Sequence, residues 1–122
     1  IKKMFNIILA SKSKVRKEIL EKNEIKCSVK PSDVDEELLK ESFLAEGASP
    51  ELISKNLAEL KANKISQKVK DQLVLGADSV IDLNGEIISK PSNRHEALEI
   101  LNKLNGNKHY LISSACISKN AS

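Results

Sequence analysis

The sequence predicts an α/β domain in which helices pack on a mixed, twisted sheet. Three observations support this fold class. An apolar strand leads directly into a helix near the N-terminus, a long amphipathic helix occupies the middle of the chain, and a continuous apolar strand ends in a tight hairpin turn. Alternating strands and helices are typical of a sheet covered by helices, whereas the hairpin adds an antiparallel pair. We expect residues 1–122 to form a single domain, since this length suffices for one core.

The first strand is expected at residues 5–10, and the helix that follows it at residues 13–23. Val15, Ile19 and Leu20 recur in this helix at the spacing of one helical face. We therefore expect these three side chains to point inward.

A short second strand is predicted at residues 26–30, closed by Pro31. The segment "SDVDEELLKES", residues 32–42, follows it and is rich in carboxylates. The pattern is compatible with an acidic loop or with a short helix.

The clearest helix is "SPELISKNLAELKANKISQKV", residues 49–69. Ser49 suits the N-cap, and Pro50 suits the first helical position, where a missing backbone N–H costs nothing. Apolar residues recur on one side of this helix: Ile53, Leu57, Leu60 and Ile65.

The next segment, residues 73–83, reads as a buried strand, and Asn84-Gly85 is a strong hairpin signal before the strand "EII". Asn93 and Glu96 have the spacing of a capping box, which predicts a helix ending at Asn105-Gly106. Four apolar residues lie along this helix: Ala97, Leu98, Leu101 and Leu104. A last strand is expected at residues 109–117.

Bulk composition excludes several classes of protein. With 40% hydrophobic and 30% charged residues the chain is not a disordered tail, and no apolar run approaches the roughly 20 residues that span a bilayer. We expect a cytoplasmic protein that binds no membrane. The net charge of +3 and three aromatic residues argue against a nucleic-acid partner. Cys27 and Cys116 lack metal-ligand spacing and are interpreted as small core residues.

Cations crowd the start of the first helix, where they oppose the helix dipole. They stand among two serines whose hydroxyls could donate to an anion: Ser11, Lys12, Ser13, Lys14, Arg16 and Lys17. Such a cluster is sensible if a polyphosphate binds there. Taken alone, a solvated lysine-rich turn is the more common explanation.

Asp78 interrupts an otherwise apolar strand beside Gly76 and Ala77. A buried carboxylate needs a partner, a metal or a functional reason. The alternative is a carboxylate at a frayed strand end, satisfied by backbone donors.

Two lysines and one acidic segment complete the candidate site. Lys61 lies at the margin of an apolar helix face, and Lys90 precedes a proline at a strand end. Each alone would usually be a surface lysine, but with Arg16 they could form a cationic clamp for phosphates. Glu36, in the acidic segment, could pair with Asp78 to hold magnesium.

Five motifs in this order resemble the Maf proteins, a family of nucleoside triphosphate pyrophosphatases related to inosine triphosphatase-like folds. The motifs are "ASKSKVRKEIL", "SDVDE", "LAELKANKI", "LGADSVIDLNGEIISKP" and "ALEILNKLNGNKHYLISSACI". The resemblance covers nearly the whole chain. Members of the family usually extend further, so the resemblance also suggests that a C-terminal part is missing here.

The resemblance implies a role for each residue that fits a family motif. Asp78 corresponds to the catalytic proton acceptor, and Glu36 and Asp78 correspond to residues near a divalent metal, Mg²⁺ or Mn²⁺. Positions that face the phosphates correspond to Ser13, Arg16, Lys61 and Lys90. Val15 and Ser79 depart from the usual residues and are candidates for setting base specificity.

The function implied is hydrolysis of a nucleoside triphosphate to the monophosphate and pyrophosphate, which would cleanse the nucleotide pool. The substrate would be dTTP or UTP, or a modified nucleotide such as 7-methyl-GTP, and "SDVDE" with Val15 looks somewhat more like the second group. The family also suggests a homodimer. Two alternatives stay open: a non-catalytic nucleotide- or phosphate-binding module, and an inactive truncated remnant.

Overall fold

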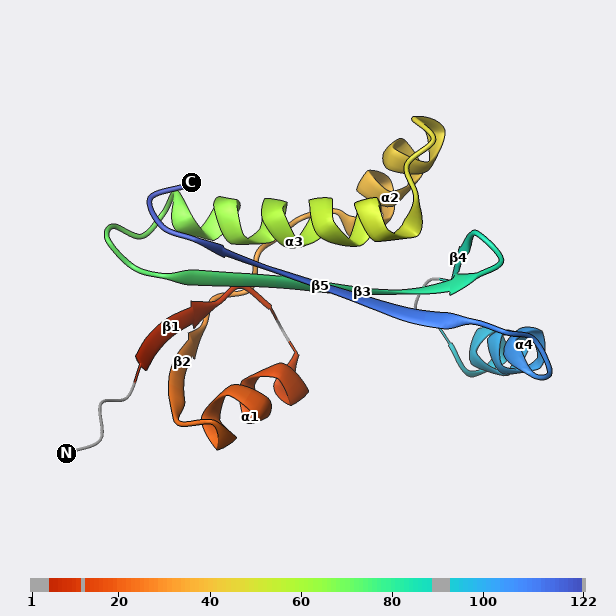
Figure 1. The fold of residues 1–122 in the computed structure, drawn as a ribbon, viewed down its shortest axis with the longest axis horizontal. Helices are drawn as coiled ribbons and strands as arrows, with labels where there is room; N and C mark the ends of the chain where they lie inside the picture. Colours follow the sequence, from red (N-terminus) through yellow and green to blue (C-terminus); the bar gives the residue numbers. More distant parts are fainter. Residues whose placement is uncertain (1–4, 12, 89–92, 122) are drawn as a thin grey trace.

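The computed structural model describes residues 5–11, 13–88 and 93–121. Strands and helices alternate along most of the chain (Figure 1). In order they are β1 (Phe5–Leu9), α1 (Lys14–Lys22), β2 (Ile25–Val29), α2 (Glu36–Ala45), α3 (Pro50–Ser66), β3 (Val74–Leu83), β4 (Glu86–Ile88), α4 (Arg94–Leu104) and β5 (Tyr110–Ser118).

The described strands form one mixed sheet, which confirms the predicted α/β class. β1 pairs in parallel with β2 and with β3, whereas β3 pairs antiparallel with β4 and with β5. The hairpin between β3 and β4 turns through Asn84 and Gly85, both with positive φ, as the Asn-Gly signal predicts. A parallel half and an antiparallel half therefore meet at β3.

The pairing of β3 leaves part of one edge open. β5 pairs with residues 74–82 of β3 and so fills one edge completely. β1 pairs with residues 74–75 and β4 with residues 81–83, so these two strands share the other edge. Among the described residues, positions 76–80 on that edge consequently have no strand partner.

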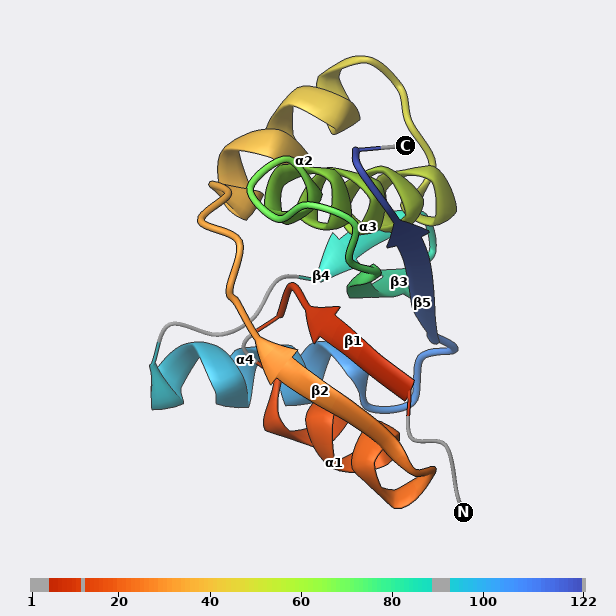
Figure 2. The same ribbon diagram turned by 90° about the vertical axis from the view of Figure 1, so that its left-hand side faces the viewer.

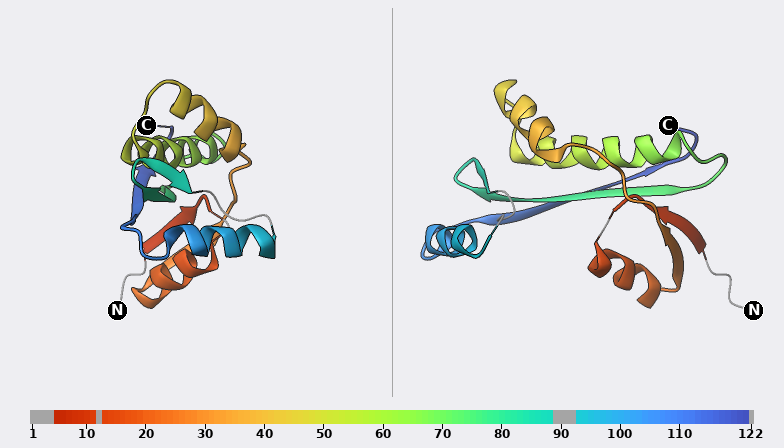
Figure 3. Two further views of the ribbon diagram at one scale, coloured as in Figure 1. Left: turned by 90° about the vertical axis from the view of Figure 1, so that its right-hand side faces the viewer. Right: turned by 180° about the vertical axis from the view of Figure 1, so that it is seen from behind.

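Helix α3 covers one side of the β3–β5 pair, and α1 lies on the other side (Figures 1 and 3). Gly76 permits this close packing, because a Cβ there would come 2.2 Å from the Ala58 carbonyl oxygen and 2.6 Å from the Ala62 nitrogen. The buried core follows this contact. It comprises Ile8, Ala10, Ala62, Ile65, Val69 and Val74, with Cys116 packed against it.

The predicted caps are present. Ser49 Oγ accepts from the Leu52 N–H at the start of α3, and Asn93 Oδ1 accepts from the Glu96 N–H at the start of α4. The sequence of the acidic segment is compatible with either a loop or a short helix. In the structure it forms a ten-residue helix, α2, capped by Asp35. The described part of the chain thus has four helices rather than the three that were clear from the pattern.

Helix α1 exposes two of the three residues that the sequence predicts to face inward, and α4 also has exposed apolar side chains. Val15 and Ile19 in α1 are 64% and 54% exposed, and Leu98 and Leu101 in α4 are more than half exposed. Leu60 in α3 is also exposed. The prediction was wrong because helical periodicity identifies an apolar side but not what covers it: α1 packs beside the edge strand β2 (Figure 2), and α4 lies at the far end of the β3–β5 arm (Figure 1).

Within the described residues, no helix has both the length and the apolar character needed to cross a membrane.

Candidate active site

Three charged side chains meet at β3: one from helix α2, one from helix α3 and one from β3 itself. Lys61 in α3 donates to Asp78 Oδ1 at 3.1 Å, and its Nζ lies 2.6 Å from Glu36 Oε1 in α2. Lys61 also donates to the Ala77 carbonyl at 3.3 Å. Lys61 and Asp78 are 6% and 4% exposed, which confirms that the carboxylate of this strand is buried with a partner. One ammonium group therefore bridges two carboxylates.

The chain builds this cluster from strand alternation and one glycine. Side chains at positions 76 and 78 of β3 face α3, because alternate strand residues point to the same side. The close approach at Gly76 holds the turn of α3 from Ala58 to Ala62, which includes Lys61, against β3 next to Asp78. The Ser54 hydroxyl, also in α3, donates to the Asp78 carbonyl at 3.1 Å and holds the strand against the helix.

Glu36 reaches the cluster because the loop before α2 is tied to α3. The Lys64 ammonium in α3 donates to the Asp33 carbonyl, and the Asp35 side chain caps α2 by accepting from the Leu38 N–H. Glu36 is then the first residue of α2. Local capping and one long-range hydrogen bond thus place this carboxylate over the end of Lys61.

The surroundings of Asp78 favour the protonated form of its carboxyl group more than water would. Burial raises the pKa of Asp78 above its ordinary value; Lys61 opposes this rise by its charge and its hydrogen bond, Glu36 adds to it, and Lys40 weakly opposes it. Asp78 Oδ2 is buried and finds no hydrogen-bond partner among the described residues. A carboxylate oxygen so placed can take a proton or contact a cation.

Lys40 is a residue that the sequence analysis missed. It is 8% exposed, and its ammonium lies 3.8 Å from the exposed carboxylate of Glu37. Lys40 follows Glu36 by four residues in α2, so the two share one helix face. This spacing could have identified Lys40 from the sequence, because a lysine one helical turn after a candidate metal ligand lies on the same side of the helix.

A second polar group surrounds Arg16 on the other side of β3. Arg16 Nη1 donates to Ser11 Oγ at 2.9 Å, and Nη2 donates to Ser79 Oγ at 3.3 Å. Ser13 caps α1, since its Oγ accepts from the Arg16 N–H at 3.2 Å. This leaves the Ser13 hydroxyl proton free to be donated to another acceptor.

The two groups meet near the open edge of β3 but do not form one clamp. Asp78 and Ser79 are consecutive strand residues, so their side chains point to opposite faces of the sheet. The Ala10 N–H donates to the Leu75 carbonyl at 2.9 Å, and Ser11 follows next to the stretch of β3 that no strand pairs on that edge. A ligand at this edge would have the Lys61 cluster on one side and Arg16 on the other.

The remaining candidates are placed as follows. Lys14 is exposed, and Lys17 lies 3.8 Å from Glu21 on the surface, so of these cations Arg16 alone is held against the sheet. Val15 is largely exposed. Lys12 and Lys90 lie outside the described residues.

A hollow of about 270 Å³ lies between α1 and the β3–β5 pair. Apolar side chains of α1 and both strands form most of its wall, and a strip of hydroxyls with Arg16 forms the rest. Its lining residues include Ile19, Leu20, Leu75, Ala77, Asp78, Ser79, Ser113 and Ser114. Ser79 therefore contributes to this hollow, whereas Val15 does not.

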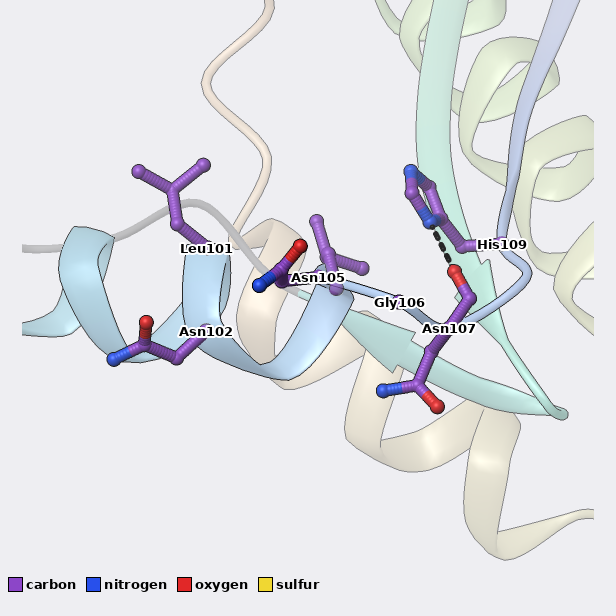
Figure 4. A pocket seen from close by; sticks show the side chains of 7 residues that line it. Leu101, Asn102, Asn105, Gly106, Asn107 and His109 are labelled. Carbon is purple, nitrogen blue, oxygen red and sulfur yellow. Dashed lines mark hydrogen bonds between the residues drawn. The ribbon is translucent and has the colours of Figure 1, made fainter.

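A second hollow, of about 750 Å³, lies at the C-terminal end of α4 (Figure 4). Its lining includes Leu101, Asn105 and His109, and His109 Nδ1 lies 3.0 Å from the Asn107 carbonyl. Its lining includes none of the predicted site residues that fall within the described part of the chain.

The donor set at Asp78 suits a hard divalent cation. Asp78 and Glu36 supply carboxylate oxygens, and Mg²⁺ commonly binds one or two carboxylates and completes its shell with water and substrate phosphates. Within the described residues, no group of three or more His, Cys, Asp or Glu side chains could enclose a metal by itself. The residues therefore fit a metal that is shared with a phosphate ligand.

Comparisons with known proteins agree with this chemistry. The sequence model of the family described as Maf-like protein matches residues 6–122. A nucleoside triphosphate pyrophosphatase of Pelagibacter ubique is 66% identical over 95% of this chain and 60% of its own length. One of Ruegeria sp. is 40% identical over 92% of this chain and 56% of its own. A dTTP/UTP pyrophosphatase of Ruminiclostridium cellulolyticum is 34% identical, over 93% and 56%. The chain thus spans about 60% or less of the length of these relatives.

Proposed function

Since the chain belongs to the Maf-like protein family, we propose that it hydrolyses a nucleoside triphosphate between the α and β phosphates. The products would be the nucleoside monophosphate and pyrophosphate. The observation that carries the proposal is the buried pair of Asp78 and Lys61, with Glu36 on the same ammonium and Arg16 nearby across β3. Relatives named nucleoside triphosphate pyrophosphatases support it.

In this proposal, Asp78 is the proton acceptor. A water oxygen attacks the α phosphorus, the bond from that phosphorus to the bridging oxygen breaks, and the water proton passes to Asp78 as pyrophosphate leaves. The raised pKa of Asp78 suits this task, because it makes the carboxylate a better base than an exposed aspartate. Lys61 holds the carboxylate through Oδ1, so Oδ2, which has no hydrogen-bond partner among the described residues, would be the oxygen that takes the proton.

The cationic residues would stabilise the triphosphate as charge builds on it. Arg16 can offer guanidinium N–H groups beyond those held by Ser11 and Ser79. Ser13 can donate its hydroxyl proton while it still caps α1. Lys90 is proposed for the same purpose on its sequence position alone.

Glu36 and Asp78 would hold Mg²⁺ or Mn²⁺. When bound, the metal would supply Lewis acidity and charge neutralisation at the phosphates. Lys61 would then have to share both carboxylates with the metal, so metal binding and the Lys61 contacts should compete.

The substrate would be a nucleoside triphosphate: either dTTP or UTP, or a modified nucleotide such as 7-methyl-GTP. Two relatives named dTTP/UTP pyrophosphatases, each 34% identical, support the first choice. Ser79 lines the hollow beside Asp78, whereas Val15 is 64% exposed, and both stay candidates for base specificity. Such an enzyme would act on the nucleotide pool of the cytoplasm, and the homodimer stays a prediction for sedimentation analysis.

The test is pyrophosphate release from dTTP, UTP, CTP, GTP and 7-methyl-GTP, with and without Mg²⁺. Asp78→Asn should lower turnover about 100-fold or more. Asp82→Asn is the matched control, because Asp82 lies in the same strand, and the hydrogen bond that its side chain makes is with the Gly85 N–H in the hairpin. Near-normal turnover of Asp78→Asn would end the proposal. Nucleotide binding without turnover, with no need for a divalent ion, would favour the phosphate-binding module instead.

A further inference from the structure

Three side chains form a row on the face of the sheet where α1 lies. One comes from α1, one from β3 and one from β5. Arg16 Nη2 donates to Ser79 Oγ at 3.3 Å, and Ser79 Oγ lies 2.8 Å from Ser113 Oγ. Ser79 and Ser113 are direct partners in the antiparallel register of β3 and β5. Because directly opposed strand residues point to the same face, both hydroxyls lie on the side of α1.

We propose that Ser113 is a positioning residue for Arg16: its hydroxyl orients that of Ser79, which in turn holds one arm of the guanidinium. This inference rests on the proposed role of Arg16 at the triphosphate.

The directions of the hydrogen bonds support this arrangement. Ser79 Oγ accepts from Arg16, so its own proton is available to Ser113. A hydroxyl that donates its proton becomes a better acceptor, so the Ser113 contact strengthens the hold on Arg16. Without Ser113, the Ser79 hydroxyl would rotate and share its lone pairs with water.

The geometry also explains why the position of Arg16 matters. Ser11, two residues after the end of β1, holds Nη1, and Ser79 in β3 holds Nη2, so two hydrogen bonds set the plane of the guanidinium. The hollow beside this plane is lined by Arg16, Ser79, Ser113 and Asp78. A fixed plane lets the remaining N–H groups meet phosphate oxygens in a defined orientation, which lysine could not reproduce.

The test compares Ser113→Val with Ser113→Thr in the 122-residue chain. These two side chains have the same shape and suit a strand equally, but only threonine keeps a hydroxyl. Binding of inorganic tripolyphosphate, measured by calorimetry without metal, should weaken about threefold to fivefold in Ser113→Val and stay near wild type in Ser113→Thr. The ¹⁵N–¹H signal of the Arg16 Nε should show greater mobility in Ser113→Val only.

Two controls separate positioning from general damage. Ser28→Ala removes an exposed hydroxyl from β2 and should change neither readout. In an Arg16→Lys background, Ser113→Val should have no further effect on binding, because the fork that it positions is gone.

Equal tripolyphosphate binding and equal Arg16 mobility in the valine and threonine variants would overturn the proposal, as would additive effects with Arg16→Lys. A wild-type chain that binds no tripolyphosphate would contradict the proposed function, while the Arg16 signal would still decide the role of Ser113.

Discussion

Lys61 donates to Asp78 at 3.1 Å in a place where both side chains are more than nine-tenths buried. Removing two opposite charges from water costs several kcal/mol per ion, and their attraction offsets that cost only when the pair is intact. Nothing in the packing of α3 on β3 requires a charge at either position. The pair is therefore better explained by chemistry than by stability.

Breaking the pair from one side should be costly. Lys61→Met keeps the length of the side chain but leaves Asp78 charged and buried, so we expect a loss of about 3 kcal/mol in unfolding free energy at neutral pH. The double variant Lys61→Met/Asp78→Asn should recover part of this loss. Urea denaturation of the four members of the cycle measures the coupling; strictly additive losses would show that the two charges do not depend on each other.

Stability should depend on pH through Asp78. Its folded pKa is raised above the ordinary value of 3.8, so between these two values the folded chain holds a proton that the unfolded chain has lost. The stabilising contribution of this proton is fully present below 3.8 and is lost as the pH rises through the folded pKa. Relative to Asp78→Asn, the wild-type chain should therefore lose stability as the pH rises through that window. Thermal melts of both proteins in EDTA test this, and a difference that stays constant with pH would refute it.

Gly76 should be intolerant of a side chain. A Cβ at this position meets the backbone of α3, so Gly76→Ala should lower the unfolding free energy by about 2 kcal/mol and reduce turnover by moving Lys61 away from Asp78. Gly47→Ala is the comparison, since Gly47 has φ +81° and open space around it and should cost about 1 kcal/mol from backbone strain alone, with turnover unchanged. Equal losses of turnover in the two variants would contradict the role of Gly76 in bringing Lys61 to Asp78.

Ser13 allows the cap to be separated from the proposed phosphate contact. Aspartate is as good an N-cap as serine and complements a helix whose first turn has no acidic residue, so Ser13→Asp should keep or raise the melting temperature. It also replaces a proton donor with a negative charge, so tripolyphosphate should bind at least about tenfold more weakly. Ser13→Ala, by contrast, should lose about 1 kcal/mol of stability with a smaller loss of binding. Undiminished tripolyphosphate binding by Ser13→Asp would remove Ser13 from the phosphate site.

Most of the secondary structure could be predicted because its signals are local. The Asn84-Gly85 turn, the Ser49 cap and the Asn93 cap depend on residues a few positions apart, and each is present. The acidic segment was less clear, although Asp35 before two glutamates is itself an N-terminal helix signal. The exposed faces of α1 and α4 could not be predicted, because the pattern of a helix does not specify what packs on it.

The candidate site divides in the same way. Neighbours along the chain are enough to identify the residues that break their local pattern: a carboxylate in an apolar strand at Asp78, a lysine at the margin of an apolar helix face at Lys61, and cations at the start of α1. These are violations of burial and dipole rules, which can be read from neighbours along the chain.

How these residues meet depends on packing between elements that are distant in the sequence. Close packing at Gly76 brings Lys61 to Asp78. The hydrogen bond from Lys64 to the Asp33 carbonyl brings Glu36 to the Lys61 ammonium. The alternation of β3 places Arg16 and Ser79 on the opposite face. The physical reason is that strand alternation assigns each side chain to a face, whereas the partner on that face depends on how helices distant in sequence pack there.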